Sequence, residues 1–149
     1  MMLTPLSILL AEDDTDDCLF FKEAIANTIH TLNTVNDGEQ LMKYLNANDK
    51  ELPHVLFLDL NMQRKNGFEC LPEIKLNNHL KNLSVVVFST SLEQEVVNQL
   101  YHNGASYFIR KPSEFKQFKN IILHALHLLS EVNAVAVTKE KFVLKIQNI

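Results

Sequence analysis

Five short apolar runs, separated by longer amphipathic stretches, constrain the fold of this chain more than any other feature of its sequence. Continuous rather than alternating apolar character is typical of strands that are covered on both faces. The intervening stretches, of about ten to twenty residues, suit crossover helices. The pattern predicts an α/β fold with a doubly wound, five-stranded parallel sheet. The runs are Leu6–Ala11, Thr31–Val35, Val55–Leu58, Val85–Phe88 and Tyr107–Ile109.

A single domain accounts for most of the chain. Its 149 residues suffice for one substantial core and are too few for two ordinary domains. We expect this domain over 1–131, with a last helix over about 113–130 whose apolar side chains recur at helical spacing. A tail follows over 132–149. Its weak apolar alternation, from Val135 to Ile146, suits an added strand, a strap over the fold or a partner-binding extension.

Turn and cap residues predict several helix boundaries. The acidic run Asp14–Asp17 predicts the start of a helix that ends near Thr28. Gly38 marks the turn into the second helix, and Gly67 opens the third. Gly104 is expected to be the left-handed residue that ends the fourth helix.

Composition excludes several classes of function. A net charge of -4 and a pI near 5.8 provide no basic field for nucleic acid or an anionic membrane, so we expect neither partner. Every apolar run is far shorter than a membrane span. Cys18 and Cys70 lack metal-type spacing and are expected to be reduced core thiols, which favours a cytoplasmic protein.

Polar residues follow four of the apolar runs. The carboxyl ends of the strands in a doubly wound sheet share one edge, where functional groups collect. Glu12 and Asp13 follow the first run, and Asp59 ends the third. Ser89 follows the fourth run and Lys111 the fifth. We therefore expect acidic, hydroxyl and basic side chains to meet around a common hollow.

The acidic residues predict a metal site. The carboxylates of Glu12, Asp13 and Asp59 would repel one another strongly at close range unless a cation lay among them. Mg²⁺ takes oxygen ligands and bridges carboxylates to a phosphate oxygen. Beside such an ion, the Asp59 carboxylate can act as a nucleophile toward a phosphoryl group and form an acyl phosphate. Lys111 and Ser89 would supply donors to the phosphoryl oxygens.

Four motifs occur in order along the chain: ILLAEDD at 8–14, VLFLDLNM at 55–62, VFST at 87–90 and KP at 111–112. Together they resemble the receiver domain of bacterial two-component response regulators over about residues 6–130. The resemblance implies a flavodoxin-like (βα)5 fold with strand order 2-1-3-4-5. It also implies a phosphoacceptor switch rather than an enzyme that acts on a separate substrate.

The resemblance assigns roles to the acidic residues. It implies Asp59 as the phosphoacceptor and Asp13 as a direct ligand of Mg²⁺ or Mn²⁺. The Asn61 backbone carbonyl is implied as a further ligand, and Glu12 as an acidic neighbour that acts through water.

The resemblance also implies a set of switch residues. Ser89 would sense the phosphoryl group through its hydroxyl, Lys111 would bind it, and Phe108 occupies the place of the switch aromatic. Phe108 lacks the hydroxyl of the usual tyrosine. Gln63 stands where many members have proline, which would loosen the loop after Asp59.

The expected partners are those of a stand-alone receiver. The resemblance implies a histidine kinase or histidine phosphotransfer protein as the donor, and the stretch 59–67 is similar to regulators served by phytochrome-type kinases. A downstream protein is expected to bind the face formed by about 92–129. A homodimer through the last helix and strand is compatible with the family.

Three alternatives share the fold or the nucleophile. A phosphohydrolase with an aspartate nucleophile would need a second carboxylate two positions later, where this chain has Asn61. A flavodoxin-like binding module would need a phosphate loop after the first strand, where Glu12 and Asp13 would repel a phosphate. A pseudo-receiver would usually have lost one of the site residues.

Some polar residues have a simpler structural interpretation. Asp16 and Asp17 suit charges at a helix start, and we exclude them as metal ligands. Ser89, or one of the next two residues, could cap the following helix. His124 and His127 lie three apart without a third ligand and are interpreted as surface residues.

Overall fold

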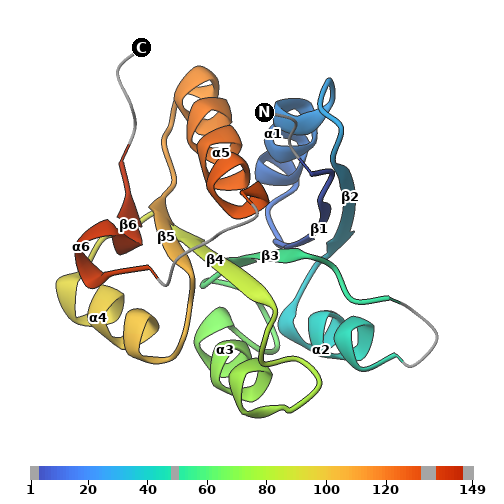
Figure 1. Cartoon of the computed structure of the whole chain (residues 1–149), viewed down its shortest axis with the longest axis vertical. Coiled ribbons are helices and arrows are strands. Elements are labelled where there is room, and N and C mark those ends of the chain that lie inside the picture. Colours follow the sequence, from blue (N-terminus) through green and yellow to red (C-terminus); the bar gives the residue numbers. More distant parts are fainter. Residues whose placement is uncertain (1–3, 48–50, 132–136, 146–149) are drawn as a thin grey trace.

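The computed structural model describes residues 4–47, 51–131 and 137–145. The strands are β1 (Ser7–Ala11), β2 (Thr31–Val35), β3 (Val55–Asp59), β4 (Ser84–Ser89), β5 (Tyr107–Arg110) and β6 (Val143–Leu144). The helices are α1 (Thr15–Ile25), α2 (Gly38–Asn46), α3 (Gly67–Leu76), α4 (Gln94–His102), α5 (Phe115–Ser130) and α6 (Lys139–Phe142). The strands pair in parallel in the order β2-β1-β3-β4-β5-β6 (Figure 1). The predicted doubly wound α/β fold and the order of its first five strands are confirmed.

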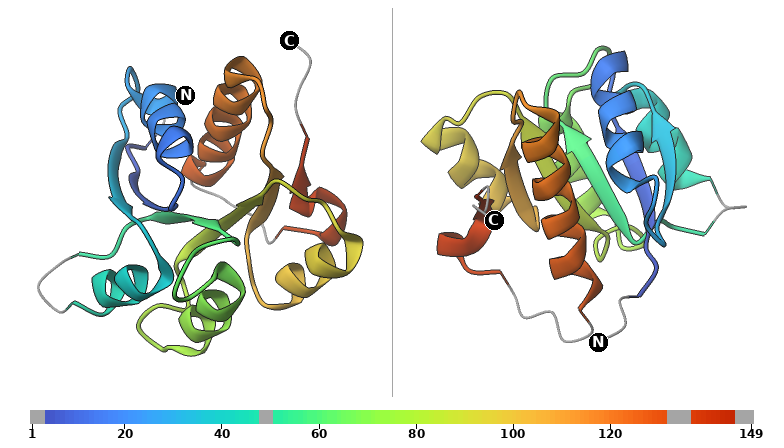
Figure 2. Two further views of the ribbon diagram at one scale, coloured as in Figure 1. Left: turned by 180° about the vertical axis from the view of Figure 1, so that it is seen from behind. Right: turned by 90° about the horizontal axis from the view of Figure 1, so that it is seen from above.

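Helices cover both faces of the sheet. α1 and α5 lie on one face, and α2, α3 and α4 lie on the other (Figures 1 and 2). Successive residues of β1 therefore enter different cores. Leu9 packs in the core on the α2 to α4 side, whereas Ile8 and Leu10 pack in the core beneath α1 and α5. This two-sided burial explains why the strand is continuously apolar.

The parallel register aligns the carboxyl ends of the central strands. Ala11 of β1 pairs with Leu58 of β3, and Asp59 pairs with Phe88 of β4. Glu12 follows Ala11 and therefore leaves the sheet beside Asp59.

Capping side chains fix the start of two helices at this edge. The Asp14 carboxylate accepts a hydrogen bond from the Asp17 backbone N–H at 3.0 Å, which confirms the predicted start of α1. Asn66 and Glu69 form a reciprocal capping box at the start of α3.

Two glycines meet local requirements that other residues would not. A Cβ at Gly67 would lie 2.6 Å from the Asp59 backbone oxygen, so only glycine lets α3 begin directly against the end of β3. Gly104 has a φ of 95°, which confirms the predicted left-handed residue after α4.

Some boundaries differ from the prediction. α1 ends at Ile25, before the expected Thr28, whose hydroxyl donates to the Ile25 carbonyl at 2.7 Å and satisfies the helix end. α5 begins at Phe115 rather than near 113. The N-cap residue of α4 is Glu93, so the alternative in which Ser89 or its two neighbours cap this helix is wrong.

The tail contributes an added strand. β6 pairs in parallel with β5, with Phe108 opposite Val143 and Ile109 opposite Leu144. Among the three alternatives for the tail, the structure therefore agrees with the added strand, although this strand spans only 143–144. The alternating positions Val135 and Ile146 lie outside the described residues.

Both cysteines are free thiols. Cys70 is buried and Cys18 is half-buried. Burial raises the pKa of each thiol to about 11, which keeps both protonated and agrees with the predicted core thiols. Across the ranges that the structure describes, no helix has the length and apolar character needed to cross a membrane.

Candidate functional site

Three carboxylates meet where β1 and β3 end. One oxygen from each of Glu12, Asp13 and Asp59 lies within 4.8 Å of the other two. Glu12 is fully buried and Asp59 is 3% exposed, whereas Asp13 is exposed to solvent. The structure thus brings together the three acidic residues predicted from the sequence. Hard divalent cations prefer such oxygen donors, so the group fits Mg²⁺ or Mn²⁺.

Lys111 completes this group from the end of β5. Its Nζ lies 2.7 Å from Glu12 Oε1, 2.9 Å from Asp17 Oδ2 and 3.6 Å from Asp59 Oδ2. The ammonium also lies 4.7 Å from the centroid of the Phe88 ring. Only 8% of its side chain is exposed, so the lysine is held in place rather than solvated.

Burial and the contact between Glu12 and Lys111 shift the pKa values of these two groups in opposite directions. The pKa of the Glu12 carboxyl is raised to about 9, mainly by burial and also by its contact with Asp59, while Lys111 opposes the rise. Burial alone would lower the pKa of Lys111, but its contacts with Glu12 and Asp17 outweigh burial and leave the pKa above its ordinary value. We conclude that Lys111 keeps its charge, because several carboxylates surround one ammonium. The crowding of the acids is what a divalent cation would relieve.

Sequence reasoning missed the contact that Asp17 makes. We excluded Asp17 as a ligand, and the structure gives it a different position, as a hydrogen-bond partner of Lys111. The available signal was helical phase. Asp17 lies one turn after the N-cap Asp14, on a helix that begins next to the three carboxylates. Its side chain can therefore point toward them.

The loop after Asp59 is well connected. The Asn61 backbone N–H donates to Asp59 Oδ1 at 3.2 Å, and the Gly67 N–H donates to the Leu60 carbonyl at 3.1 Å. Lys65 forms an ion pair with Glu73 of α3. Proline at position 63 is therefore not needed to tie this loop to α3.

The two predicted switch residues are buried. Ser89 is 2% exposed, and its hydroxyl accepts a hydrogen bond from the Ser91 backbone N–H at 3.4 Å. Its carbonyl accepts from the Lys111 N–H at 2.8 Å, which links the ends of β4 and β5. Phe108 is fully buried in the core on the side of α3 and α4.

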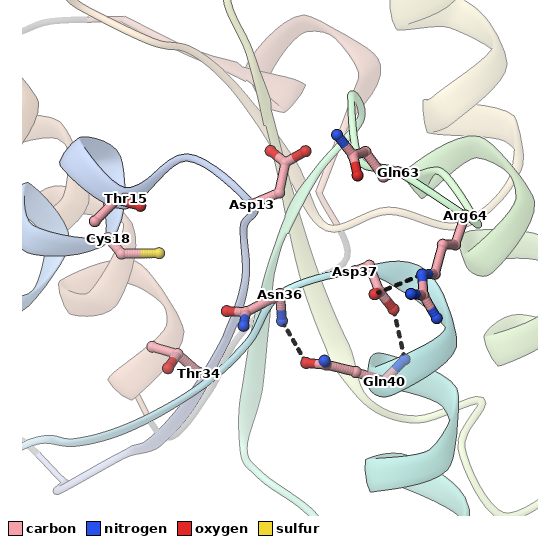
Figure 3. A pocket seen from close by; sticks show the side chains of 9 residues that line it. All are labelled: Asp13, Thr15, Cys18, Thr34, Asn36, Asp37, Gln40, Gln63 and Arg64. Atoms are coloured by element: carbon pink, nitrogen blue, oxygen red, sulfur yellow. Dashed lines mark hydrogen bonds and ion pairs between the residues drawn. The ribbon is translucent and has the colours of Figure 1, made fainter.

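A polar cavity of about 510 Å³ opens beside Asp13. Figure 3 shows Asp13, which follows β1, between Thr15 and Cys18 on one side of the cavity and Gln63 and Arg64 on the other. Arg64 pairs with Asp37 at 3.8 Å, and Asp37 accepts a hydrogen bond from the Gln40 N–H at 2.8 Å. The exposed carboxylate of the acidic group is therefore reachable from solvent.

Comparison with known proteins assigns the family. The model of the response regulator receiver domain matches residues 8–123, so this chain belongs to that family. Response regulator Rcp1 of Synechocystis sp. is 32% identical over 124 residues, which cover 79% of this chain and 84% of Rcp1.

Solved structures agree with this assignment. The phosphorylated cyanobacterial phytochrome response regulator RcpA is 33% identical, with a TM-score of 0.77 over 82% of this chain and 91% of RcpA. The Mn²⁺-bound form of Rcp1 is 29% identical, with a TM-score of 0.78 over 86% of this chain and 96% of Rcp1. A divalent metal ion is the cofactor that the acidic group of this chain fits.

Proposed function

We propose that this chain is a phosphorylation switch in two-component signal transduction, in which Asp59 accepts a phosphoryl group with the help of a divalent cation. The observation that carries the proposal is the meeting of Glu12, Asp13 and Asp59 within 4.8 Å of one another, beside the ammonium of Lys111. Membership of the receiver domain family supports it.

Asp59 is the nucleophile. One of its carboxylate oxygens bonds to phosphorus while the bond between phosphorus and the donor's leaving nitrogen breaks, and that nitrogen keeps the electron pair and takes up a proton. The product is an acyl phosphate on Asp59. The Asn61 N–H and the Lys111 ammonium orient the two oxygens of the carboxylate before the transfer.

The neighbouring residues bind the metal ion and the phosphoryl group. Asp13, Asp59 and the Asn61 backbone carbonyl would hold the ion, and Glu12 would act through a water molecule. When bound, the ion supplies positive charge that stabilises the phosphoryl oxygens. Lys111 donates to one phosphoryl oxygen, for which it leaves its carboxylate partners.

Ser89 and Phe108 transmit the change. The Ser89 hydroxyl donates to a phosphoryl oxygen, which favours one arrangement of the loop between β4 and α4. Phe108 follows by packing alone, because phenylalanine has no hydroxyl. The face formed by α4, β5 and α5 then changes its preference for partner proteins.

The phosphoryl donor is a histidine kinase or a histidine phosphotransfer protein. Several similar proteins are named as phytochrome response regulators, which supports a phytochrome-type kinase as the donor class. The two free cysteines and this class of donor support a cytoplasmic location. A homodimer through α5 and β5 would have to accommodate β6 at the outer edge of β5.

The phosphohydrolase alternative is disfavoured by Asn61. Its exposed side chain is an amide, which has no acidic proton to give to a leaving alcohol. The chain therefore has a nucleophile without the general acid that a hydrolase of this type requires.

Incubation with Mg²⁺ and a small-molecule phosphodonor such as acetyl phosphate tests the proposal by intact-protein mass spectrometry. We expect a gain of one phosphoryl group, which is lost with EDTA and in the Asp59→Asn variant. Asp16→Asn is the matched control, because it makes the same change at an exposed carboxylate outside the group. Labelling of the Asp59→Asn variant to the wild-type extent would refute the assignment.

A further inference from the structure

The C-terminal segment 137–145 closes the outer edge of β5. β6 pairs with Phe108 and Ile109 of β5. Phe142 is 1% exposed, and its ring centroid lies 5.3 Å from that of Tyr101 in α4. The Tyr101 hydroxyl donates to the backbone oxygen of the first residue of the segment at 3.3 Å. The segment is therefore packed against β5 and α4, and its outer surface becomes part of this side of the molecule.

A cavity of about 550 Å³ lies between this segment and the loops that follow β4 and β5. We call it the C-terminal groove. Leu144 lines it from β6, Leu92 and Pro112 from the two loops, and Ile121 from α5. Leu92 is 45% exposed, so its side chain supplies a contact surface for an apolar partner group.

The charge of the groove has one sign. Arg110 and Lys145 are exposed cations that line it, and among the residues that the structure describes, none that lines it is acidic. Lys111 also lines the groove, but its ammonium is engaged by carboxylates. A cationic groove on a chain with a net charge of -4 is a local feature rather than a consequence of overall composition.

We propose that the C-terminal groove binds an acidic peptide segment of a partner protein in an extended conformation. Alternate side chains of an extended peptide point in opposite directions. One set can place apolar groups against Leu92 and Leu144, while the other places carboxylates near Arg110 and Lys145. A free inorganic anion would use only the cations, and a nucleic acid would be repelled by the net negative charge of the chain.

The groove shares the loops after β4 and β5 with the phosphoryl site. Thr90 and Lys111 line it. Thr90 follows Ser89, and we assign phosphoryl binding to Ser89 and Lys111. Regulation of the groove by phosphorylation rests on the proposed function. Binding of the peptide to the unmodified protein does not, and the experiment measures that binding.

The probe is a fluorescently labelled synthetic peptide in which Asp and Glu alternate with Leu, and fluorescence anisotropy reports its binding. A peptide with Lys in place of the acids serves as the counterpart, and we expect it to bind at least about tenfold more weakly. Arg110→Glu combined with Lys145→Glu should weaken the acidic peptide about tenfold or more. Lys116→Glu makes the same charge change at an exposed position of α5 outside the groove, and it should change the affinity less than about twofold.

Two further variants separate specific docking from other causes. Leu92→Ser should weaken binding several-fold without changing the charge, and Lys145→Glu alone covers the case in which Arg110→Glu does not fold. Asp59→Asn should bind the peptide like the wild type, so failure of the phosphorylation experiment and failure of this one are distinguishable. Equal affinity for the acidic and basic peptides, or an equal loss with Lys116→Glu, would overturn the proposal.

Discussion

The acidic edge of β1 and β3 and the C-terminal segment 137–145 are supported in different ways. β1 and β3 each lie between two strands and under helices on both faces, and all five residues of β3 are buried. β6 has two residues and pairs only with β5 among the strands that the structure describes. A strand held on every side can fix charged groups at its end. A segment held from one side can detach without unfolding the rest.

This difference suits the two functions that we propose. Phosphoryl transfer needs Asp59 and Lys111 held in place, because misplacement of reacting groups slows the reaction steeply. A partner-binding groove can tolerate, and can use, a wall that opens. The comparison predicts that changes in the middle of the sheet act on the whole fold, whereas changes in the segment act locally.

Phe57→Ala should have the largest effect on stability. Phe57 is fully buried in β3, and its ring centroid lies 4.8 Å from that of Phe21 and 6.4 Å from that of Phe88. Truncation leaves a cavity and should lower the free energy of unfolding by about 3–5 kcal/mol, measured by urea denaturation. The conservative Phe57→Leu should cost far less. A loss of stability that only one local probe detected would contradict cooperative unfolding of the middle of the sheet.

Lys111→Met should have the next largest effect, on phosphorylation. The variant keeps the length of the side chain but removes the donor to the phosphoryl oxygens, so the rate of Asp59 labelling should fall about 100-fold. Lys116→Met is the matched control and should label at the wild-type rate. Thermal unfolding of both variants shows whether the fold is kept. An unchanged rate in folded Lys111→Met would remove Lys111 from the mechanism.

Phe142→Ala provides the direct contrast with Phe57→Ala. Both rings are almost completely buried, yet loss of Phe142 can be met by release of the segment. The free energy of unfolding should fall on the order of 1 kcal/mol. Hydrogen exchange should become fast in 137–145 while β1 and β3 stay protected. A loss equal to that of Phe57→Ala, with exchange accelerated throughout, would show that the segment belongs to the cooperative core.

The middle of the sheet and most of the site could be predicted from the sequence, because they follow from local pattern. Continuous apolar runs require cover on both faces, and parallel strands bring Glu12, Asp59 and Lys111 to one edge. The sequence left an added strand as one of three alternatives for the tail. It could not decide among them, since two residues carry no periodicity and the burial of Phe142 depends on tertiary packing. The contact of Asp17 with Lys111 depends on the exact phase of α1.

Acidification should have the smallest effect, and it tests the opposite end of β1. The Leu6 backbone N–H donates to Nδ1 of His30 at 3.0 Å, and burial lowers the pKa of His30 below its ordinary value of 6.5. The unfolded chain therefore binds the proton more readily, so this contribution to stability is complete above pH 6.5 and is lost as the pH falls below it. His30→Asn keeps an acceptor for the Leu6 N–H without titrating, and its unfolding free energy should fall less than that of the wild type between pH 7 and pH 5. Because β1 belongs to the middle of the sheet, the loss of stability of the wild type at low pH should accelerate hydrogen exchange in β1 and β3 together. Equal pH dependence of the two proteins would show that His30 makes no such contribution.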